Sequence, residues 1–340
     1  MSNWYSDKEN KNCVTVSTRI RLARNLSDLA FPSQMTNEAR EELKLRMKSA
    51  IKQNNSPLIK SLKYIDMADV PENEINAMVE RHVISPEFAR TNTGKAIILS
   101  DDESISIMVG EEDHIRIQVI LAGLCLEKAY KTAQELDSIL NEKLSFAFDP
   151  KLGYLTECPT NLGTGLRASV MMHLPLLEST GQLKQIGDSV GKIGFTVRGI
   201  YGEGSKAKSS LYQISNQITL GLSEENAIKN LSQIVEQIIE KERKAEGYIE
   251  KIVLEDKILR AKGVLENCRL LTSEEMMNLL SLINLGIRLG IINSEYETIK
   301  LLIEAGPYML MKKYGTSTPE ERDIKRAEYV REQFEAYRKA

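Results

Sequence analysis

The feature that most constrains the fold is a change of sequence pattern near residue 250. Before this point, short β-rich runs cluster with a few long helical patterns, whereas only helical patterns follow it. Strands that cluster, instead of alternating regularly with helices, favour an α+β fold over a Rossmann arrangement. Single hydrophobic cores stop growing well below 340 residues. We therefore predict two domains, one over residues 1–250 and a smaller, all-helical one over residues 251–340.

The first domain is expected to contain an antiparallel sheet flanked by helices. Residues 95–100, 104–109 and 115–119 are β-rich or alternate between apolar and polar side chains, and they are predicted to be neighbouring antiparallel strands. An amphipathic helix over residues 124–144 is expected to cover this sheet. Further strands are predicted over residues 153–156, 169–173, 194–198 and 211–214, and further helices over residues 38–52 and 223–246.

Helix-start signals recur in the second domain. Each consists of a hydroxyl residue followed three positions later by a glutamate, which is the pattern of a capping box. The pairs are Thr272 with Glu275, Ser294 with Glu297, and Thr318 with Glu321. Pro319 also occupies a favoured first helical position. These signals predict several separate helices after residue 250.

Composition excludes several classes of protein. Hydrophobic residues make up 42% and charged residues 27% of the chain, which excludes a wholly disordered protein. The net charge of −3 gives no electrostatic footprint for direct nucleic-acid binding. The polar N-terminus has no apolar centre of the kind found in secretory signals, and no apolar stretch is long enough for a membrane span. A cytoplasmic protein without membrane contact is expected.

Cysteine and histidine usage argues against a structural metal. The four cysteines lie far apart without CxxC spacing, and there are only three histidines. The motifs of common phosphate-binding proteins are also absent, since GIYGEGSK at residues 199–206 misses the Walker A spacing and no HRD or DFG sequence occurs. We predict no metal site built from protein ligands alone.

Arginines beside glycines and strand ends are the strongest chemical signal. A guanidinium group is permanently charged and fork-shaped, which suits the oxygens of a triphosphate. Taken singly, each such residue is typical of a surface or salt-bridged arginine. The five arginines concerned are Arg19, Arg21, Arg116, Arg167 and Arg198.

The motifs that surround these arginines resemble those of the phosphagen, or ATP:guanido, kinases. The resemblance is carried by CPTNLGTGLRASV at 158–170, STRIR at 17–21 and EEDHIRI at 111–117. STRIRLARNL, ERHVISPEF, RGIYGEGS and the late RDIKRA at 322–327 are similar to the bacterial protein-arginine kinase family called McsB, and the resemblance covers nearly the whole chain. It implies a glutamine-synthetase-like catalytic domain followed by a helical domain.

The resemblance also implies a nucleotide site. It assigns the five arginines to the phosphates of ATP and His82 to a nucleotide contact, although a lone histidine is also compatible with a structural role. Magnesium is expected on the nucleotide oxygens and water. The implied ATP-binding residues are Ser17, Thr18, Arg19, Ile20, Arg21, His82, Arg116, Arg167, Ala168, Ser169, Val170, Met171, Arg198, Gly199, Ile200, Tyr201, Gly202 and Glu203.

Two glutamates complete the implied site, Glu112 and Glu203. An arginine acceptor has a pKa above about 12 and attacks only if a positioned base removes a proton. We favour Glu203 as the base and Glu112 as the group that orients the acceptor. Cys158 corresponds to the reactive cysteine of phosphagen kinases, near the substrate guanidinium, and its alternative role is that of a small buried apolar residue.

Two departures from the phosphagen kinases bear on the substrate. Gly110 stands where those enzymes commonly have asparagine, and STRIR begins at Ser17, which leaves no room for their small N-terminal domain. An open site suits arginines on protein surfaces, so we predict an ATP-dependent protein arginine kinase. The alternatives are a kinase of free arginine or another small guanidino compound, and a phosphoarginine-binding adaptor.

The late RDIKRA segment raises a second site. Arg322, Asp323 and Arg326 have the spacing of a solvated ion-pair helix. The resemblance instead implies an allosteric phosphoarginine site, in which an acid meets the guanidinium and arginines meet the phosphate. It further implies a homodimer through the helical domain, and as partners a zinc-containing activator, a heat-shock repressor and a Clp unfoldase, with marked proteins passing to regulation or Clp-dependent degradation.

Overall fold

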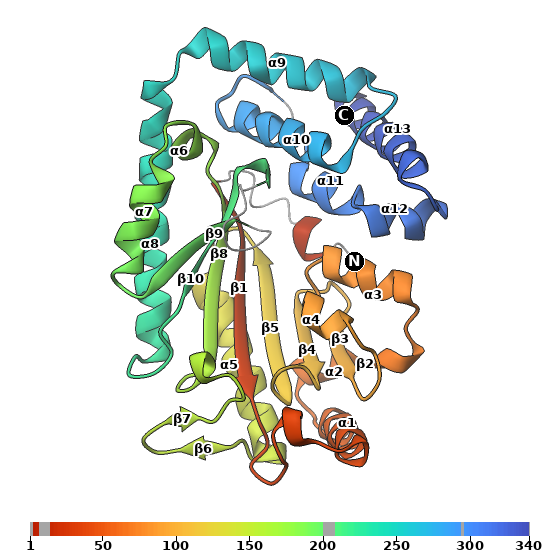
Figure 1. The fold of residues 1–340 in the computed structure, drawn as a ribbon, viewed down its shortest axis with the longest axis vertical. Helices are drawn as coiled ribbons and strands as arrows, with labels where there is room; N and C mark the ends of the chain where they lie inside the picture. The colour runs from red at the N-terminus through yellow and green to blue at the C-terminus, as the bar shows by residue number, and fades with distance from the viewer. Residues whose placement is uncertain (1–2, 7–13, 200–207, 294–295, 340) are drawn as a thin grey trace. The chain divides into compact units, whose positions relative to one another are not determined.

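The computed structural model describes residues 3–6, 14–199, 208–293 and 296–339, and its elements are labelled in Figure 1. The strands are β1 Thr15–Arg24, β2 Leu62–Asp66, β3 Ala96–Ser100, β4 Ile105–Val109, β5 Ile115–Ala122, β6 Phe148–Asp149, β7 Gly153–Tyr154, β8 Leu166–His173, β9 Phe195–Gly199 and β10 Leu211–Asn216. The α-helices are α1 Asn37–Lys52, α2 Pro57–Lys60, α3 Glu72–Glu80, α4 Pro86–Ala89, α5 Leu126–Leu144, α6 Pro175–Ser179, α7 Leu183–Gly191, α8 Glu224–Ala245, α9 Lys251–Asn267, α10 Ser273–Arg288, α11 Thr298–Glu304, α12 Pro307–Tyr314 and α13 Pro319–Lys339.

The chain divides into two compact units. Unit 1 consists of Met1–Trp4, Ser17–Val170 and Ser215–Gln233, and unit 2 consists of Tyr5–Val16, Met171–Ile214 and Ile234–Ala340. The chain therefore passes between the units several times. Unit 1 holds most of the sheet, and unit 2 holds the helices after residue 250 together with β9 and the shorter helices α6 and α7.

The main sheet has the strand order β2-β3-β4-β5-β1-β8-β10-β9. The ladders that join β2 to β3, β3 to β4, β4 to β5 and β5 to β1 are antiparallel. Helix α5 packs against β5, as Figure 1 shows, and it buries Leu136 and Leu140. The α+β fold, the three neighbouring strands and the covering helix predicted from the sequence are confirmed.

Strand β1 has two different faces because side chains alternate along a strand. Ile20 and Leu22 are fully buried, whereas Arg19 and Arg21 between and beside them are only half-buried. One face of β1 therefore enters the core. The other face presents guanidinium groups in a partly open environment.

The helical part of unit 2 begins as its sequence signals predicted. Thr272 accepts a hydrogen bond from Glu275 N (3.1 Å), and the Thr318 hydroxyl and Glu321 carboxylate cap each other's backbone amides (3.2 Å each). Ser294 lies outside the described residues, and α11 starts at Thr298. The described residues after 250 contain helices and no strand.

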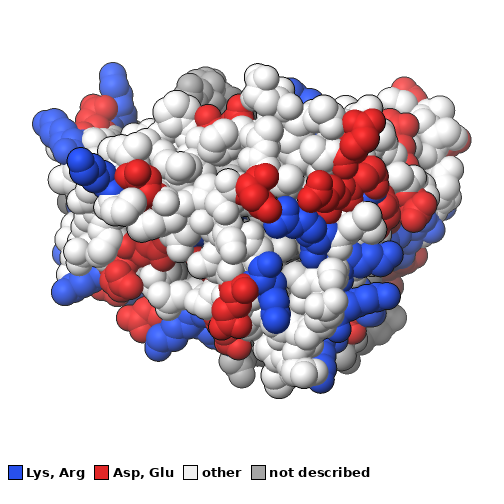
Figure 2. Space-filling view, turned by 90° about the horizontal axis from the view of Figure 1, so that it is seen from below, with Lys and Arg blue, Asp and Glu red and all other residues white. Residues whose placement is uncertain are grey.

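Charge on the surface is mixed. The face drawn in Figure 2 shows acidic and basic side chains side by side, without a large area of one sign. Such a face lacks the continuous basic surface that nucleic acids require. Among the described residues, no helix combines the length and the apolar character needed to cross a bilayer.

Candidate active site

Four arginines of unit 1 gather on one side of the sheet. In the β1–β5 ladder, Arg21 stands opposite Gln118 and Ala23 stands opposite Arg116. Residues two apart on a strand share a face, as do directly opposed residues of neighbouring strands. Arg116 therefore projects on the same side of the sheet as Ala23 and Arg21. Strand β8, which carries Arg167, is the other neighbour of β1.

The proximity of these guanidinium groups contributes to the lowered pKa values of Arg19 and Arg21. Burial, followed by the positive charges of Arg167 and Arg116, lowers the pKa of Arg19 to about 10. The pKa of Arg21 is also lowered, first by burial and then by the charges of Arg19, Arg116 and Arg167. Each charge makes its neighbours less stable, and a bound anion would relieve this repulsion, as Glu111 partly does for Arg21.

Arg116 and Arg21 differ in their hydrogen-bond partners. Arg116 is held by Glu111, with its Nη1 2.6 Å and its Nη2 2.5 Å from the two carboxylate oxygens. The Ser85 hydroxyl also donates to Glu111. By contrast, Arg21 Nε is buried and has no hydrogen-bond partner among the described residues. An orphaned donor among concentrated positive charge fits the oxygens of a nucleotide phosphate.

His82 lies beside this cluster. Burial and then the charge of Arg19 lower its pKa to about 4, so the ring is neutral at physiological pH. Its backbone is left-handed, with φ of +61°, which is uncommon for a residue with a side chain. Gln118 holds this conformation because its Nε2 donates to His82 O (2.9 Å). The structure thus brings His82 and Arg19 close to each other.

Glu112 and Cys158 also come together. The pKa of Glu112 is raised, mainly by burial and against the lowering charge of Arg116, and a hydrogen bond from Cys158 also lowers it. Arg116 Nη2 lies 3.4 Å from Glu112, whose side chain remains 46% exposed. The Cys158 sulfur lies 3.0 Å from the Thr160 hydroxyl. The Glu112 carboxylate is thus accessible and adjoins both Arg116 and Cys158.

Several other residues of the implied ATP site have structural contacts. Thr18 Oγ1 donates to Gly123 O (2.7 Å) and accepts from Cys125 N (3.0 Å), which fixes the loop after β5. Ala168 N donates to Asn216 Oδ1 (2.8 Å), and the Ser169 hydroxyl donates to Arg19 O (3.4 Å). Ser17, Ile20 and Val170 are buried. These residues shape the strands from which the arginines project.

The remaining implied ATP residues belong to unit 2 or lie outside the described residues. Met171 follows Val170 on β8, and Arg198 and Gly199 end β9, where Arg198 is half-buried. Ile200, Tyr201, Gly202 and Glu203 lie outside the described residues.

Sequence reasoning missed the residues that support the acidic loop. Asp113 Oδ1 accepts hydrogen bonds from Asn25 Nδ2 (2.7 Å) and from Glu157 N (2.8 Å). Glu157 is the residue before Cys158. Asn25 Oδ1 in turn accepts from His114 N (2.8 Å). Their place beside the recognised motifs is the signal that could have drawn attention to them. They tie the Glu112 loop to the Cys158 loop.

Two glycines of the motifs are required by the backbone. Gly165 has φ of +61°, and an added Cβ would lie 2.6 Å from Ala23 O. Gly110 has φ of +82°, and its Cβ would lie 2.9 Å from Gly94 O.

The late RDIKRA segment lies at the start of α13. Arg326 is 1% exposed and donates from Nε to Ala305 O (2.9 Å) and from Nη1 to Leu271 O (2.8 Å). Asp323 Oδ1 lies 2.5 Å from Arg326 Nη1. Arg326 thus joins α13 to the segment before α10 and to the end of α11, while Arg322 is half-buried.

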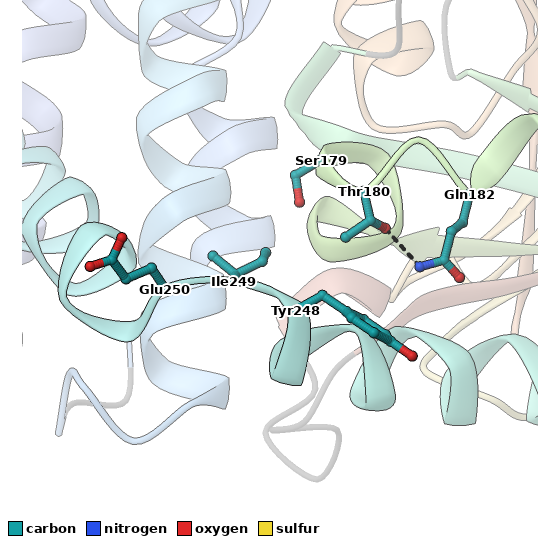
Figure 3. A pocket seen from close by; sticks show the side chains of 6 residues that line it. All are labelled: Ser179, Thr180, Gln182, Tyr248, Ile249 and Glu250. Carbon is teal, nitrogen blue, oxygen red and sulfur yellow. Dashed lines mark hydrogen bonds between the residues drawn. The ribbon is translucent and has the colours of Figure 1, made fainter.

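A pocket in unit 2 lacks the features of the arginine cluster. It contains one carboxylate and no basic side chain, and on one side of it Gln182 donates to the Thr180 hydroxyl (3.0 Å), as Figure 3 shows. Its lining residues are Ser179, Thr180, Gln182, Tyr248, Ile249 and Glu250. Such a lining does not suit a triphosphate. Within the described part of the chain, no group of three His, Cys, Asp or Glu side chains could hold a metal ion.

Comparison with known proteins gives the class that this fold and site define. The family model for the ATP:guanido phosphotransferase C-terminal catalytic domain matches residues 42–245. A lombricine kinase structure shares the fold, with a TM-score of 0.62 at 23% identity over 74% of this chain and 73% of that one. The duplicated taurocyamine kinase of Schistosoma mansoni gives a TM-score of 0.59 at 27% identity. That match covers 72% of this chain and 35% of the taurocyamine kinase.

More similar relatives narrow the class. The protein-arginine kinase of Halothermothrix orenii is 45% identical over 97% of this chain and 96% of its own length. The protein-arginine kinase of Bacillus subtilis is 42% identical over 98% of this chain and 93% of its own. The model for the C-terminal domain of protein-arginine kinase McsB matches residues 251–340. The chain belongs to the protein-arginine kinase family of the ATP:guanido phosphotransferases.

Proposed function

We propose that the protein transfers the γ-phosphoryl group of ATP to arginine side chains of other proteins. The observation that carries this proposal is the cluster of Arg19, Arg21, Arg116 and Arg167, in which burial and then the neighbouring guanidinium charges lower the pKa of Arg19 and Arg21. Such a cluster requires an anion of high charge, and a triphosphate is the ligand that the family chemistry supplies. The names of the relatives support arginine in proteins as the acceptor.

The residues of the chain act mainly by alignment. The unit 1 arginines, together with Arg198, hold phosphate oxygens and stabilise charge on the transferring group. Ser17 to Arg21, His82, Arg167 to Met171 and Arg198 to Glu203 form the nucleotide-binding segments. Magnesium supplies further charge neutralisation when bound, and the nucleotide oxygens and water provide most of its ligands.

The acceptor guanidinium is held by carboxylates. Glu112 orients its planar fork, and Cys158 contacts the same ligand; the hydrogen bond from the Cys158 thiol to Glu112 supports these roles. Glu203 removes the proton as attack proceeds. Glu203→Gln should keep ATP binding in a nucleotide titration and lose transfer in a single-turnover assay. Near-normal transfer by that variant would assign the base elsewhere.

A direct test identifies the modified side chain. The chain is incubated with MgATP and a protein substrate, and the products are examined by mass spectrometry without acid treatment. Phosphate on arginine side chains supports the proposal. Turnover of free arginine at the rate seen with protein would favour a small-molecule kinase, and phosphoarginine binding without transfer would favour an adaptor.

The helical region has a regulatory role in this proposal. We place a dimerisation and regulatory domain over residues 251–340, with Arg322, Asp323 and Arg326 as an allosteric phosphoarginine site. Because Arg326 already binds two backbone carbonyls, phosphoarginine would have to exchange with these contacts. Calorimetry of Asp323→Ala combined with Arg326→Ala tests this, and unchanged phosphoarginine affinity would remove the site.

The cellular setting is also part of the proposal. We infer a homodimer that acts in the cytoplasm on proteins with accessible arginines. Its partners would be a zinc-containing activator, a heat-shock repressor and a Clp unfoldase. Co-purification from cells, with the size of the complex measured by light scattering, tests these partners.

A further inference from the structure

Trp4 is tied into unit 1 at both its backbone and its ring. It is 5% exposed, its backbone N donates to Asp102 O (2.9 Å), and its indole Nε1 donates to Arg81 O (3.0 Å). A terminal segment is poorly ordered unless contacts of this kind hold it. The side chain is therefore part of the folded unit.

The ring of Trp4 lies against the residue that follows Arg81. The Trp4 and His82 ring centroids are 6.2 Å apart, with a tilt of 52° between the planes. This separation lies within the range of aromatic pairs. Trp4 thus contacts His82 directly and also binds the carbonyl that precedes it.

The backbone of His82 needs such support. Its φ of +61° belongs to a sparsely populated region for residues with a side chain, and such conformations persist where the surroundings hold them. Gln118 Nε2 binds His82 O (2.9 Å), and Trp4 binds Arg81 O on the other side of the residue. The two contacts hold the backbone on either side of the His82 Cα.

The side chain of Arg81 forms ion pairs with two acidic residues. Its guanidinium binds Glu103 (2.9 Å) and Glu74 (2.9 Å). Its carbonyl is what links the 81–82 backbone to Trp4. A change at Trp4 is therefore transmitted to the His82 ring, whereas the ion pairs of Arg81 can remain.

We propose that Trp4 is a positioning residue of the nucleotide site, which fixes the His82 ring beside Arg19 so that the ring can contact the nucleoside part of ATP. The proposal rests on the proposed function, because it assumes that the arginine cluster binds the phosphates. Trp4 touches neither the transferred group nor the acceptor. It should therefore affect ATP binding more than the chemical step.

The first test uses the fact that Trp4 is the only tryptophan of the chain. The full chain is titrated with MgADP while tryptophan emission is recorded. A saturable change in intensity or wavelength, with the same midpoint as binding measured by calorimetry, supports the proposal. Calorimetric binding without any change in emission overturns it.

The second test separates positioning from folding. Trp4→Ala should raise KM for ATP about tenfold, change kcat less than twofold at saturating ATP, and leave KM for the protein substrate unchanged. Trp4→Phe keeps a ring against His82 and should stay within about threefold of the parent KM. Leu140→Ala, which opens the core beneath α5, is the matched control for lost stability and should leave KM for ATP unchanged.

The outcomes distinguish the two proposals. If the parent chain transfers no phosphate to arginine under any condition, the proposed function fails. If the parent is active but both Trp4 variants keep its KM for ATP, the role of Trp4 fails. A fall in kcat equal to that of Leu140→Ala, with KM unchanged, would likewise assign Trp4 to folding alone. Should Trp4→Ala not fold, Trp4→Phe and the titration of the parent still decide the matter.

Discussion

Two adjacent glutamates should respond in opposite ways to the same substitution. The Glu111 side chain is 3% exposed and binds both terminal nitrogens of Arg116, whereas the Glu112 side chain is 46% exposed and lies 3.4 Å from the same guanidinium. Glu111→Gln should therefore destabilise unit 1. Glu112→Gln should leave the fold intact and impair phosphoryl transfer.

The magnitudes follow from burial. Removing one partner of a buried ion pair costs about 3–5 kcal/mol, and the amide oxygen retained by glutamine offsets part of this loss. We expect about 3 kcal/mol for Glu111→Gln, because the remaining positive charges of the cluster also lose a neighbouring anion. An exposed pair contributes at most about 1 kcal/mol, so the change for Glu112→Gln should be smaller than that.

Urea unfolding followed by Trp4 emission is the assay, since Trp4 belongs to unit 1 with both glutamates. A ligand at 100 times its Kd stabilises a protein by about 2.7 kcal/mol, so saturating MgATP should restore much of the stability of Glu111→Gln. Single-turnover transfer should fall at least about 100-fold in Glu112→Gln. Equal unfolding midpoints for Glu111→Gln and the parent would refute the argument that the buried Glu111–Arg116 ion pair stabilises unit 1.

Three further predictions concern unit 2. Arg198→Lys keeps the charge but loses the planar fork, so kcat/KM should fall more than about tenfold at an unchanged unfolding midpoint, and unchanged kinetics would place Arg198 outside the phosphate site. Glu242 is fully buried and accepts hydrogen bonds from Leu176 N, Leu177 N and Arg288. Glu242→Ala should therefore lower the free energy of unfolding, measured by calorimetry, by about 3–5 kcal/mol. As a control, Glu240→Ala at an exposed position of the same helix should lower it by less than about 0.5 kcal/mol. Burial and then the charge of Arg288 lower the pKa of His173 to about 3, so the folded state favours the neutral ring. The contribution of this ring to the free energy of unfolding is complete above pH 6.5 and declines by roughly 1.4 kcal/mol per pH unit as the pH falls towards 3. His173→Gln should flatten this part of the profile of stability against pH.

The elements that could be predicted from the sequence are those with a strong local pattern. Residues 115–119 alternate on β5, and α5 carries an apolar stripe that needs a partner surface. The reciprocal cap of Thr318 and Glu321 depends on two residues three positions apart, which a sequence displays directly. Local periodicity and local hydrogen bonding are the physical terms that a single sequence contains.

The residues that escaped prediction depend on contacts between distant segments. Glu111 and Glu112 look alike in the sequence, and only the fold places one against Ser85 and Arg116 and the other near Cys158. Arg326 has the spacing of a solvated helix face, yet it is buried against the carbonyls of Leu271 and Ala305. Neither difference is encoded by spacing.

Strand β1 shows how charge compensation separates structural arginines from those that bind ligands. Arg24 is 1% exposed, but Asp137 binds its guanidinium from both carboxylate oxygens (2.8 and 3.1 Å), and the Tyr154 ring lies 3.5 Å from its Cζ. Arg19 and Arg21 project from the opposite face towards further positive charge, and their pKa values fall. A buried arginine with a carboxylate is satisfied by the fold itself. Arg19 and Arg21 instead lie among further guanidinium groups, whose repulsion a bound anion would relieve, and this difference supports the proposal that this face of β1 binds the nucleotide.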